Sequence, residues 1–138
     1  YHGVNQAARL RQLMGSETSR LILPGNVGNV GDWYRASALF VLSSRFEGYP
    51  NVLLEAMASG LPCLAVDCPT GPSDLIDPGL NGWLVSEQVA AADMKQPLRL
   101  ALEDAAARVA FASRAQTVRQ HNGPESLRPI FLDLMGSL

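Results

Sequence analysis

Two carboxylates, Glu47 and Glu55, stand eight residues apart in this sequence, and the seven residues between them carry no charge. Gly48 follows the first carboxylate and removes a side chain at a point where a ligand could approach the backbone closely. Carboxylate oxygens accept hydrogen bonds from sugar hydroxyls or from a ribose diol, but they cannot bind phosphate directly. The pair is therefore suited to a ligand that presents hydroxyl groups at two places.

The segment between the carboxylates is predicted to begin a helix, Asn51–Ser59. The first amides of such a helix, those of Asn51, Val52 and Leu53, have no acceptor within the helix and add to the positive end of its dipole. Such a helix start is a ready site for a diphosphate. The order of carboxylate, amides and carboxylate fits a ligand with sugar, diphosphate and ribose in succession.

A purely structural interpretation of these residues stays open, because glutamates eight residues apart are common. Glu55 would then belong to a solvated helix face and Glu47 to a turn. Two neighbours carry similar alternatives: Arg45 could contact phosphate or form a structural ion pair, and Tyr49 could line a sugar pocket or pack on an exposed loop.

Short apolar runs alternate with helical segments along the chain, and this alternation predicts an α/β fold. The expected strands are Arg20–Leu23, Leu39–Leu42, Leu61–Val66 and Trp83–Val85. The expected helices are Asn5–Met14, Trp33–Ala38 with Asp32 as its cap, Asn51–Ser59, Ser73–Ile76 with Ser73 as its cap, Gln88–Asp93, Pro97–Val118 in one or two pieces, and Glu125–Met135. The architecture is a Rossmann-like parallel sheet with helices on both faces and a helical C-terminal tail. Open sheets of this kind bind ligands beyond the carboxyl ends of their strands, which is where Glu47 falls.

Composition narrows the class of protein further. The chain has 138 residues and a net charge of −2, which allows one domain and, without a long basic run, argues against nucleic acid as a partner. No apolar stretch approaches the ~20 residues of a membrane span, and the opening residues do not form a signal peptide. Cys63 and Cys68 sit in positions that disfavour a disulfide, and no cysteine or histidine cluster suggests a metal site. We expect a cytoplasmic location.

Residues 43–62 read Ser-Ser-Arg-Phe-Glu-Gly-Tyr-Pro-Asn-Val-Leu-Leu-Glu-Ala-Met-Ala-Ser-Gly-Leu-Pro. This run resembles the Glu-x7-Glu motif of the retaining GT-B glycosyltransferases of family 4, also called group 1 transferases. The resemblance includes Trp33–Ser37 before it, and it continues through Val66–Pro69 and Gly71–Pro72 to Asn81–Val85. It covers roughly residues 20–86 closely and the helical remainder loosely.

The resemblance implies a role for each matching residue. Glu47 would contact hydroxyls of the transferred sugar near the reacting centre, which makes it the candidate catalytic residue. The backbone from Gly48 to Leu53 would hold the sugar and the diphosphate, Glu55 would bind the ribose hydroxyls, and a loop at residues 25–27 would lie against the base. The binding residues so assigned are Gly48, Tyr49, Pro50, Asn51, Val52, Leu53, Glu55, Gly25, Asn26 and Val27.

The resemblance also implies the substrates and the domain context. The donor would be a nucleotide sugar, a UDP-sugar first and a GDP-sugar next, used without metal or other cofactor. The acceptor would be a glycan or a lipid-linked sugar, and the full-length protein could work at the inner face of the membrane. Residues 1–138 would form the C-terminal nucleotide-sugar-binding domain, truncated at its N-terminus and lacking the acceptor domain. An Arg and a Lys that neutralise the diphosphate in the family have no match here, so the fragment alone is expected to be inactive.

Two other functions remain as alternatives. The chain could be a non-catalytic remnant or interaction module that no longer transfers a sugar. It could also belong to an epimerase-like enzyme that acts on nucleotide sugars with the same fold. That enzyme would need further acid and base groups, and the run from Pro50 to Glu55 argues against it.

Overall fold

The computed structural model describes residues 6–118. The expected helix Glu125–Met135 therefore lies outside the described residues. The chain divides into two compact units, Tyr1–Val30 and Gly31–Leu138. Among the described residues, no helix combines the length and apolar character needed to cross a bilayer.

The first unit contains the α-helix α1 (Gln6–Met14), as predicted, followed by the 3₁₀ helix η1 (Gly15–Arg20). The strand predicted at Arg20–Leu23 is wrong. Arg20 ends η1, and the residues after it pair with no strand within 6–118, so that Ile22 is 70% exposed. An extended segment becomes a strand only when a neighbouring strand takes its backbone hydrogen bonds, and an apolar run does not supply that neighbour.

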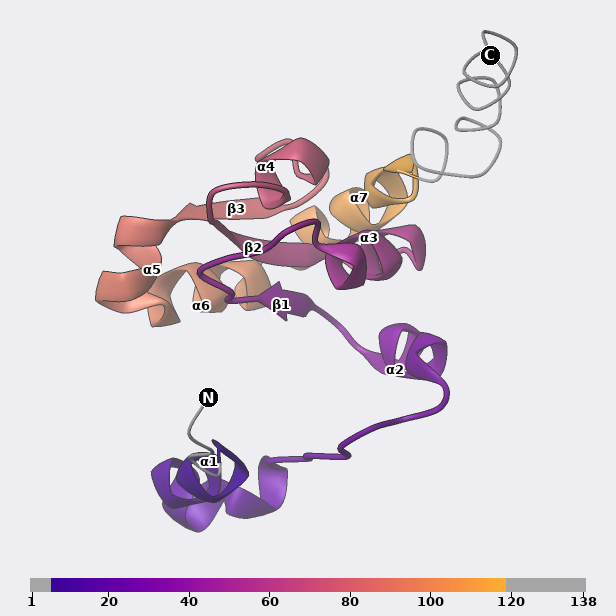
Figure 1. Ribbon diagram of the computed structural model, residues 1–138. Coiled ribbons are helices and arrows are strands. Elements are labelled where there is room, and N and C mark those ends of the chain that lie inside the picture. Colours follow the sequence, from indigo (N-terminus) through magenta and orange to yellow (C-terminus); the bar gives the residue numbers. More distant parts are fainter. Residues whose placement is uncertain (1–5, 119–138) are drawn as a thin grey trace, which may run out of the picture. The chain divides into compact units, whose positions relative to one another are not determined.

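From Val30 onward, strands and helices alternate as predicted (Figure 1). The elements are α2 (Val30–Ala36), β1 (Phe40–Leu42), α3 (Asn51–Ala58), β2 (Cys63–Asp67), α4 (Pro72–Leu75), β3 (Trp83–Ser86), α5 (Glu87–Asp93), α6 (Lys95–Glu103) and α7 (Ala105–Ala115). The three strands form one parallel sheet in the order β1-β2-β3. The predicted α/β fold class is confirmed.

The central strand β2 shows why helices cover both faces of the sheet. Cys63 and Ala65 belong to the larger hydrophobic cluster, to which α3, α4 and α7 contribute. Leu64, between them, belongs to a second cluster with residues of β3, α5 and α6. Successive strand residues point to opposite faces, so a strand that is apolar at every position is buried on both sides.

Two predicted helix caps differ from the structure. The helix α2 begins at Val30 rather than after Asp32, whose carboxylate lies in the first turn and pairs with Arg35. The helix α4 begins at Pro72, and Gly71, not Ser73, occupies the cap position without a side-chain hydrogen bond. Proline is favoured in the first helical turn because its missing N–H is one that the helix leaves unpaired.

The helical tail is divided by side chains that cap successive helices. The hydroxyl oxygen of Ser86 accepts a hydrogen bond from the amide of Val89, and α5 begins there. The carboxylate of Asp104 accepts a hydrogen bond from the amide of Ala107, with 2.8 Å between Oδ1 and the nitrogen. Asp104 therefore splits the segment predicted at 97–118 into α6 and α7.

Candidate functional site

The carboxyl ends of the three parallel strands meet at one edge of the sheet. The strand β1 is followed by the loop that carries Glu47, β2 by the loop at residues 68–71, and β3 directly by α5. This edge is the usual ligand-binding place in open α/β sheets. The structure thus positions Glu47 where the sequence predicts it.

The loop that carries Glu47 is fixed at both of its ends. Leu42, the last residue of β1, is 8% exposed, and Pro50, which precedes α3, is among the fully buried side chains. Between them, the backbone carbonyl of Glu47 lies 2.6 Å from the hydroxyl oxygen of Thr70. Nothing in the residue type of Thr70 indicates this contact, which joins residues 23 positions apart.

The helix α3 begins at Asn51 as predicted, and its inner face is held by Leu53, which is 0% exposed. Two of its three first amides bond to carbonyls that precede the helix, which agrees with the prediction that they have no acceptor within it but leaves them less available to a ligand. The amide of Asn51 donates to the carbonyl of Tyr49 and the amide of Leu53 to that of Pro50, each at 2.9 Å. These are turns that tighten the helix start, and the positive end of the helix dipole still faces the loop of Glu47.

Glu55 is exposed on α3 and makes a contact with the neighbouring helix α2. The hydroxyl of Tyr34 lies 3.2 Å from Oε2 of Glu55 and 3.4 Å from the carbonyl oxygen of Val52. Burial raises the pKa of Tyr34, and the negative charge of Glu55 raises that pKa further. Sequence reasoning did not assign Tyr34 a role, although it lies in the Trp33–Ser37 segment that matches the family.

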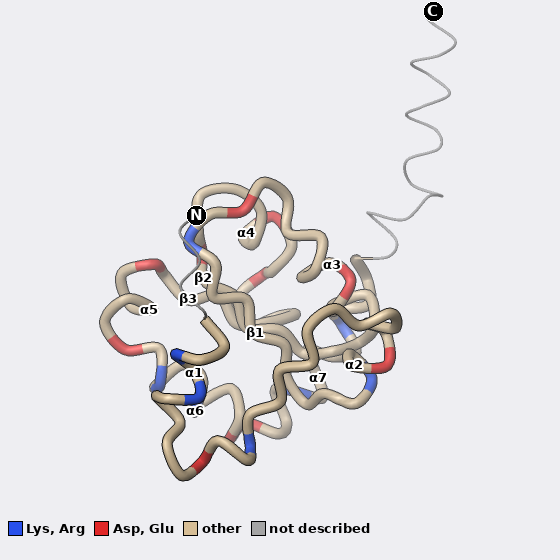
Figure 2. Tube along the Cα trace, turned by 60° about the horizontal axis from the view of Figure 1, so that its bottom comes forward, with Lys and Arg blue, Asp and Glu red and all other residues tan. Residues whose placement is uncertain are grey.

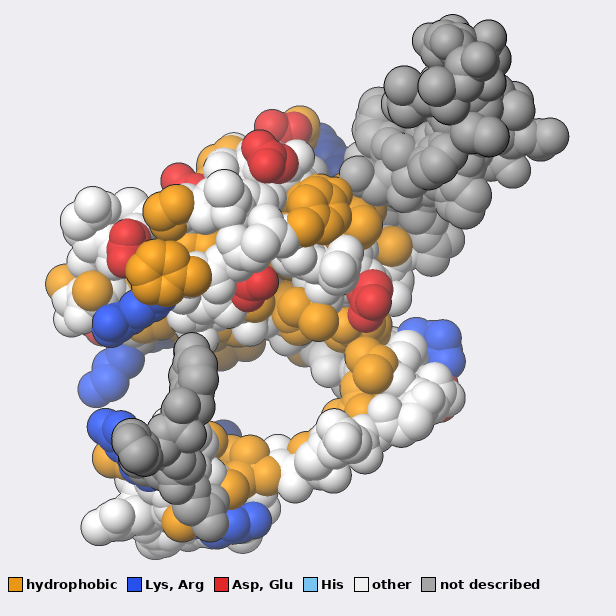
Figure 3. Space-filling model, viewed as in Figure 1, with side chains coloured by type: hydrophobic (Ala, Val, Ile, Leu, Met, Phe, Trp, Pro, Cys, Tyr) orange, Lys and Arg blue, Asp and Glu red, His pale blue; other side chains and the backbone are white. Residues whose placement is uncertain are grey.

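The side chains between the two carboxylates leave an open surface. Tyr49 is 46% exposed and Val52 is 45% exposed, and no heavy atom lies within 4 Å of the point where a Cβ of Gly48 would stand. Both interpretations of Tyr49 therefore stay open. On the visible face in Figure 3, hydrophobic side chains form separate patches among polar ones.

Gly25, Asn26 and Val27 belong to the first unit, whereas Glu47 and Glu55 belong to the second. Each unit is described by itself. Their place against a nucleotide base stays a prediction.

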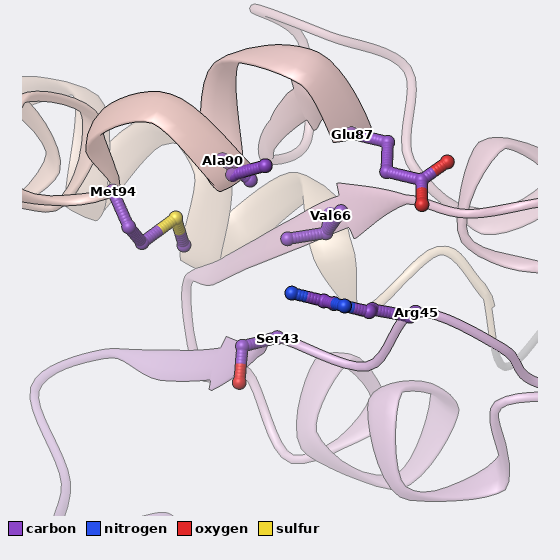
Figure 4. A pocket seen from close by; sticks show the side chains of 7 residues that line it. Ser43, Arg45, Val66, Glu87, Ala90 and Met94 are labelled. Carbon is purple, nitrogen blue, oxygen red and sulfur yellow. The ribbon is translucent and has the colours of Figure 1, made fainter.

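A cavity of about 310 Å³ opens at the carboxyl edge of the sheet, beneath α5. Its lining residues are Ser43, Arg45, Val66, Glu87, Ala90, Ala91 and Met94. Figure 4 shows the side chain of Arg45 extending into the space between Ser43 and Val66. Within residues 6–118 the ion pairs are Arg20–Glu17, Arg35–Asp32 and Arg99–Glu103, so the structural ion pair considered for Arg45 is not formed there.

Charges of both signs are distributed over the described part of the chain without a basic stripe (Figure 2). A second hollow, of about 370 Å³, adjoins the first because both are lined by Glu87. It is lined by Asp67, Cys68, Pro69, Thr70, Ser73, Ser86, Glu87 and Gln88. The carboxyl edge is therefore hollowed over β2 and β3, and Thr70 lies between this hollow and the loop of Glu47.

Comparison with solved structures places the fold among glycosyltransferases. The crystal structure of HepE from Anabaena, in complex with UDP and glucose, matches with a TM-score of 0.82 at 22% identity, covering 95% of this chain and 36% of that one. The C-terminal domain of the group 1 family protein LpcC from Francisella tularensis matches with a TM-score of 0.67 at 22% identity, covering 85% of this chain and 62% of that one. These likenesses establish a glycosyltransferase fold of the GT-B type.

Comparison of the sequence with family models identifies the family to which the chain belongs. The family model described as glycosyl transferases group 1 matches residues 2–104, and the chain belongs to this family. A lipopolysaccharide 1,6-galactosyltransferase of Salmonella typhimurium is 59% identical over 44 residues, which are 32% of this chain and 12% of that protein. The chain thus spans a minor part of the length of this relative.

Proposed function

We propose that this chain is the nucleotide-sugar-binding domain of a retaining family 4 glycosyltransferase, which transfers a sugar from a nucleoside diphosphate to a glycan or lipid-linked acceptor. The observation that carries the proposal is one arrangement at the carboxyl edge of the sheet. Glu47 lies in the loop after β1, the N-terminus of α3 follows, and Glu55 stands one turn into that helix.

Each part of the arrangement meets a different part of the donor. Glu47 accepts hydrogen bonds from hydroxyls of the transferred sugar, and Glu55 accepts them from the ribose diol. The hydroxyl of Tyr34, whose oxygen lies 3.2 Å from Oε2 of Glu55, donates a hydrogen bond to that carboxylate and holds it in a fixed orientation before the ligand arrives. Preorganisation of this kind lowers the entropy that binding costs.

The diphosphate lies between the two carboxylates in this proposal. The positive end of the α3 dipole faces it, and the exposed backbone at Gly48 allows close approach. Arg45 supplies a positive charge at the same edge of the sheet, since it extends into a cavity there without an ion-pair partner among the described residues. Fixed dipoles and basic groups of this kind stabilise the charge on the leaving diphosphate.

A UDP-sugar is the favoured donor, with a GDP-sugar as the second choice. HepE was crystallised with UDP and glucose, and the relative from Salmonella typhimurium is a galactosyltransferase.

HepE and the relative from Salmonella typhimurium are both longer than this chain, and the matched part of LpcC is a C-terminal domain. We therefore assign residues 1–138 to the donor half of a two-domain cytoplasmic enzyme that works at the inner face of the membrane. The acceptor binds mainly to the other half, so these residues alone bind the donor without transferring its sugar.

The proposal is tested by titrating the 138-residue chain with UDP, GDP and ADP while recording amide chemical shifts by NMR. We expect one nucleotide to bind saturably with a Kd of about 0.1–1 mM, equivalent to roughly 4–5.5 kcal/mol. The shifts should concentrate at residues 48–55. Absence of binding by all three nucleotides at concentrations of about 10 mM would contradict the proposal and favour a non-catalytic module.

A further inference from the structure

The loop between β2 and α4 contains two successive residues with positive φ, Thr70 at 78° and Gly71 at 108°. Among residues 6–118, Thr70 is the only residue other than glycine with a positive φ. A β-branched side chain is disfavoured in this region, and such a conformation persists only where the surrounding structure compensates for it. The compensating contacts are on the loop of Glu47.

The hydroxyl of Thr70 lies within hydrogen-bond distance of two backbone carbonyls. One is that of Glu47, at 2.6 Å, and the other is that of the preceding residue, Pro69. A hydroxyl has one proton and donates to one of them at a time. The contact with Pro69 is local, so the contact with Glu47 is the one that joins the two loops.

Gly71 fits against the other end of the same loop. A Cβ built on Gly71 would stand 2.4 Å from Cδ of Pro50, which is closer than any real contact. Pro50 is fully buried and cannot move aside without disturbing the start of α3. Thr70 and Gly71 therefore contact both ends of the short segment from Glu47 to Pro50.

We infer that Thr70 is a positioning residue, which holds the backbone of Glu47 so that its carboxylate meets the sugar of the donor. The inference rests on the proposed function, in which Glu47 binds sugar hydroxyls. Because Thr70 bonds the carbonyl and not the carboxylate, the side chain of Glu47 keeps its acceptor oxygens for the ligand. Its effect is thus on the sugar and not on the nucleotide.

The hold on the loop is tested first without ligand, by ¹⁵N relaxation of the 138-residue chain. In Thr70→Val, which removes the hydroxyl but keeps the shape, the order parameters of Glu47 and Gly48 should fall from about 0.85 toward 0.6. Thr70→Ser keeps the hydroxyl and should retain the original values. Thr117→Val is the matched control, since it removes a hydroxyl that bonds the carbonyl of Arg114 in α7. Unchanged order parameters in Thr70→Val would overturn the inference.

The functional consequence is tested by the ratio of the affinities for UDP-galactose and UDP. Thr70→Val should reduce this ratio severalfold and leave the Kd for UDP within about twofold, and Thr70→Ser should restore it. Thr70→Gly also removes the hydroxyl, and glycine adopts a positive φ without strain. It therefore provides a folded variant if Thr70→Val does not fold. The same loss in the affinity ratio is expected for it. If Glu47→Gln lowers the ratio and both hydroxyl-free variants keep it, the inference is overturned while the proposed function stands. If the unaltered chain binds neither ligand, the proposed function fails, and the relaxation experiment alone decides whether Thr70 holds the loop.

Discussion

The phenol oxygen of Tyr34, on α2, lies 3.2 Å from Oε2 of Glu55, on α3, although 21 residues separate them. The ring of Tyr34 also packs edge-to-face against Phe40 of β1, with centroids 6.0 Å apart. The phenol is therefore positioned by the sheet as well as by α3, whose Val52 carbonyl oxygen lies 3.4 Å from it. This contact links the orientation of Glu55 to the scaffold of the second unit.

Replacing Tyr34 with Phe keeps the packing on Phe40 and removes only the hydroxyl. We expect the Kd for UDP to rise about threefold to tenfold, because one hydrogen bond to Glu55 contributes roughly that much when its carboxylate must be held in place. Amide titration by NMR measures the change. In the double variant with Glu55→Gln the two effects should be less than additive, and full additivity would show that Tyr34 does not act through Glu55.

Gly48 provides a test that separates binding from folding. Its φ is not positive, and an added Cβ would meet no heavy atom within 4 Å, so the fold gives no reason for glycine there. Gly48→Ala should leave the thermal midpoint within about 2 °C of the original, since surface changes of this kind cost less than about 0.5 kcal/mol. It should weaken binding of a UDP-sugar, because the donor approaches the backbone at this point. Unchanged affinity would remove Gly48 from the site.

Gly82 presents the opposite case, in which the fold itself requires glycine. A Cβ at this position would stand 2.9 Å from the carbonyl oxygen of Cys63, in the central strand, and 3.3 Å from a side-chain carbon of Ile76. Gly82→Ala should lower the free energy of unfolding by about 1–3 kcal/mol, as measured by urea denaturation. Gly28→Ala is the control, because open space surrounds that position. Equal stabilities of the two variants would contradict this packing.

The thiol of Cys63 predicts how stability depends on alkaline pH. Burial in the central strand raises the pKa of this thiol from 9.0 to about 12. Below pH 9 the thiol is protonated in both the folded and the unfolded state, and its contribution to the free energy of unfolding is fully present. As pH rises from 9 to 12, the unfolded thiol ionises first and the free energy of unfolding falls.

The corresponding measurement is urea unfolding of the chain and of Cys63→Ala between pH 8 and 12. The variant should be less stable at pH 8 and should lose less stability with rising pH. Tyr34, whose pKa is raised from 10.0, contributes in the same direction above pH 10, so Tyr34→Phe separates its share. A parallel pH dependence for the chain and Cys63→Ala would contradict the assignment to Cys63.

Local patterns in the sequence predicted the elements of the site. The apolar runs at Leu39–Leu42 and Leu61–Val66 contain β1 and most of β2, and the segment from Asn51 forms α3 at nearly its predicted length. Glu47 and Glu55 consequently lie where predicted, past the end of β1 and one turn into α3. These features depend on residues close in sequence, and composition and periodicity can therefore predict them.

Contacts between distant residues were beyond sequence reasoning. Tyr34 meets Glu55 and Thr70 meets Glu47 across 21 and 23 residues, and neither residue type indicates its partner. The strand expected at Arg20–Leu23 is absent for the same reason, since a strand depends on a neighbour and not only on its own side chains. The positive φ of Thr70 could not be anticipated, because threonine is a poor residue for that conformation.

The most direct test of the central claim is the affinity of the 138-residue chain for UDP before and after Glu55→Gln, with Glu103→Gln as the control. Both glutamates are exposed on helices, and Glu103 forms a surface ion pair with Arg99 away from the carboxyl edge. The proposal predicts at least a tenfold rise in Kd, or about 1.4 kcal/mol, for Glu55→Gln alone. Equal affinities of the unaltered chain and both variants would contradict the assignment of Glu55 to the ribose.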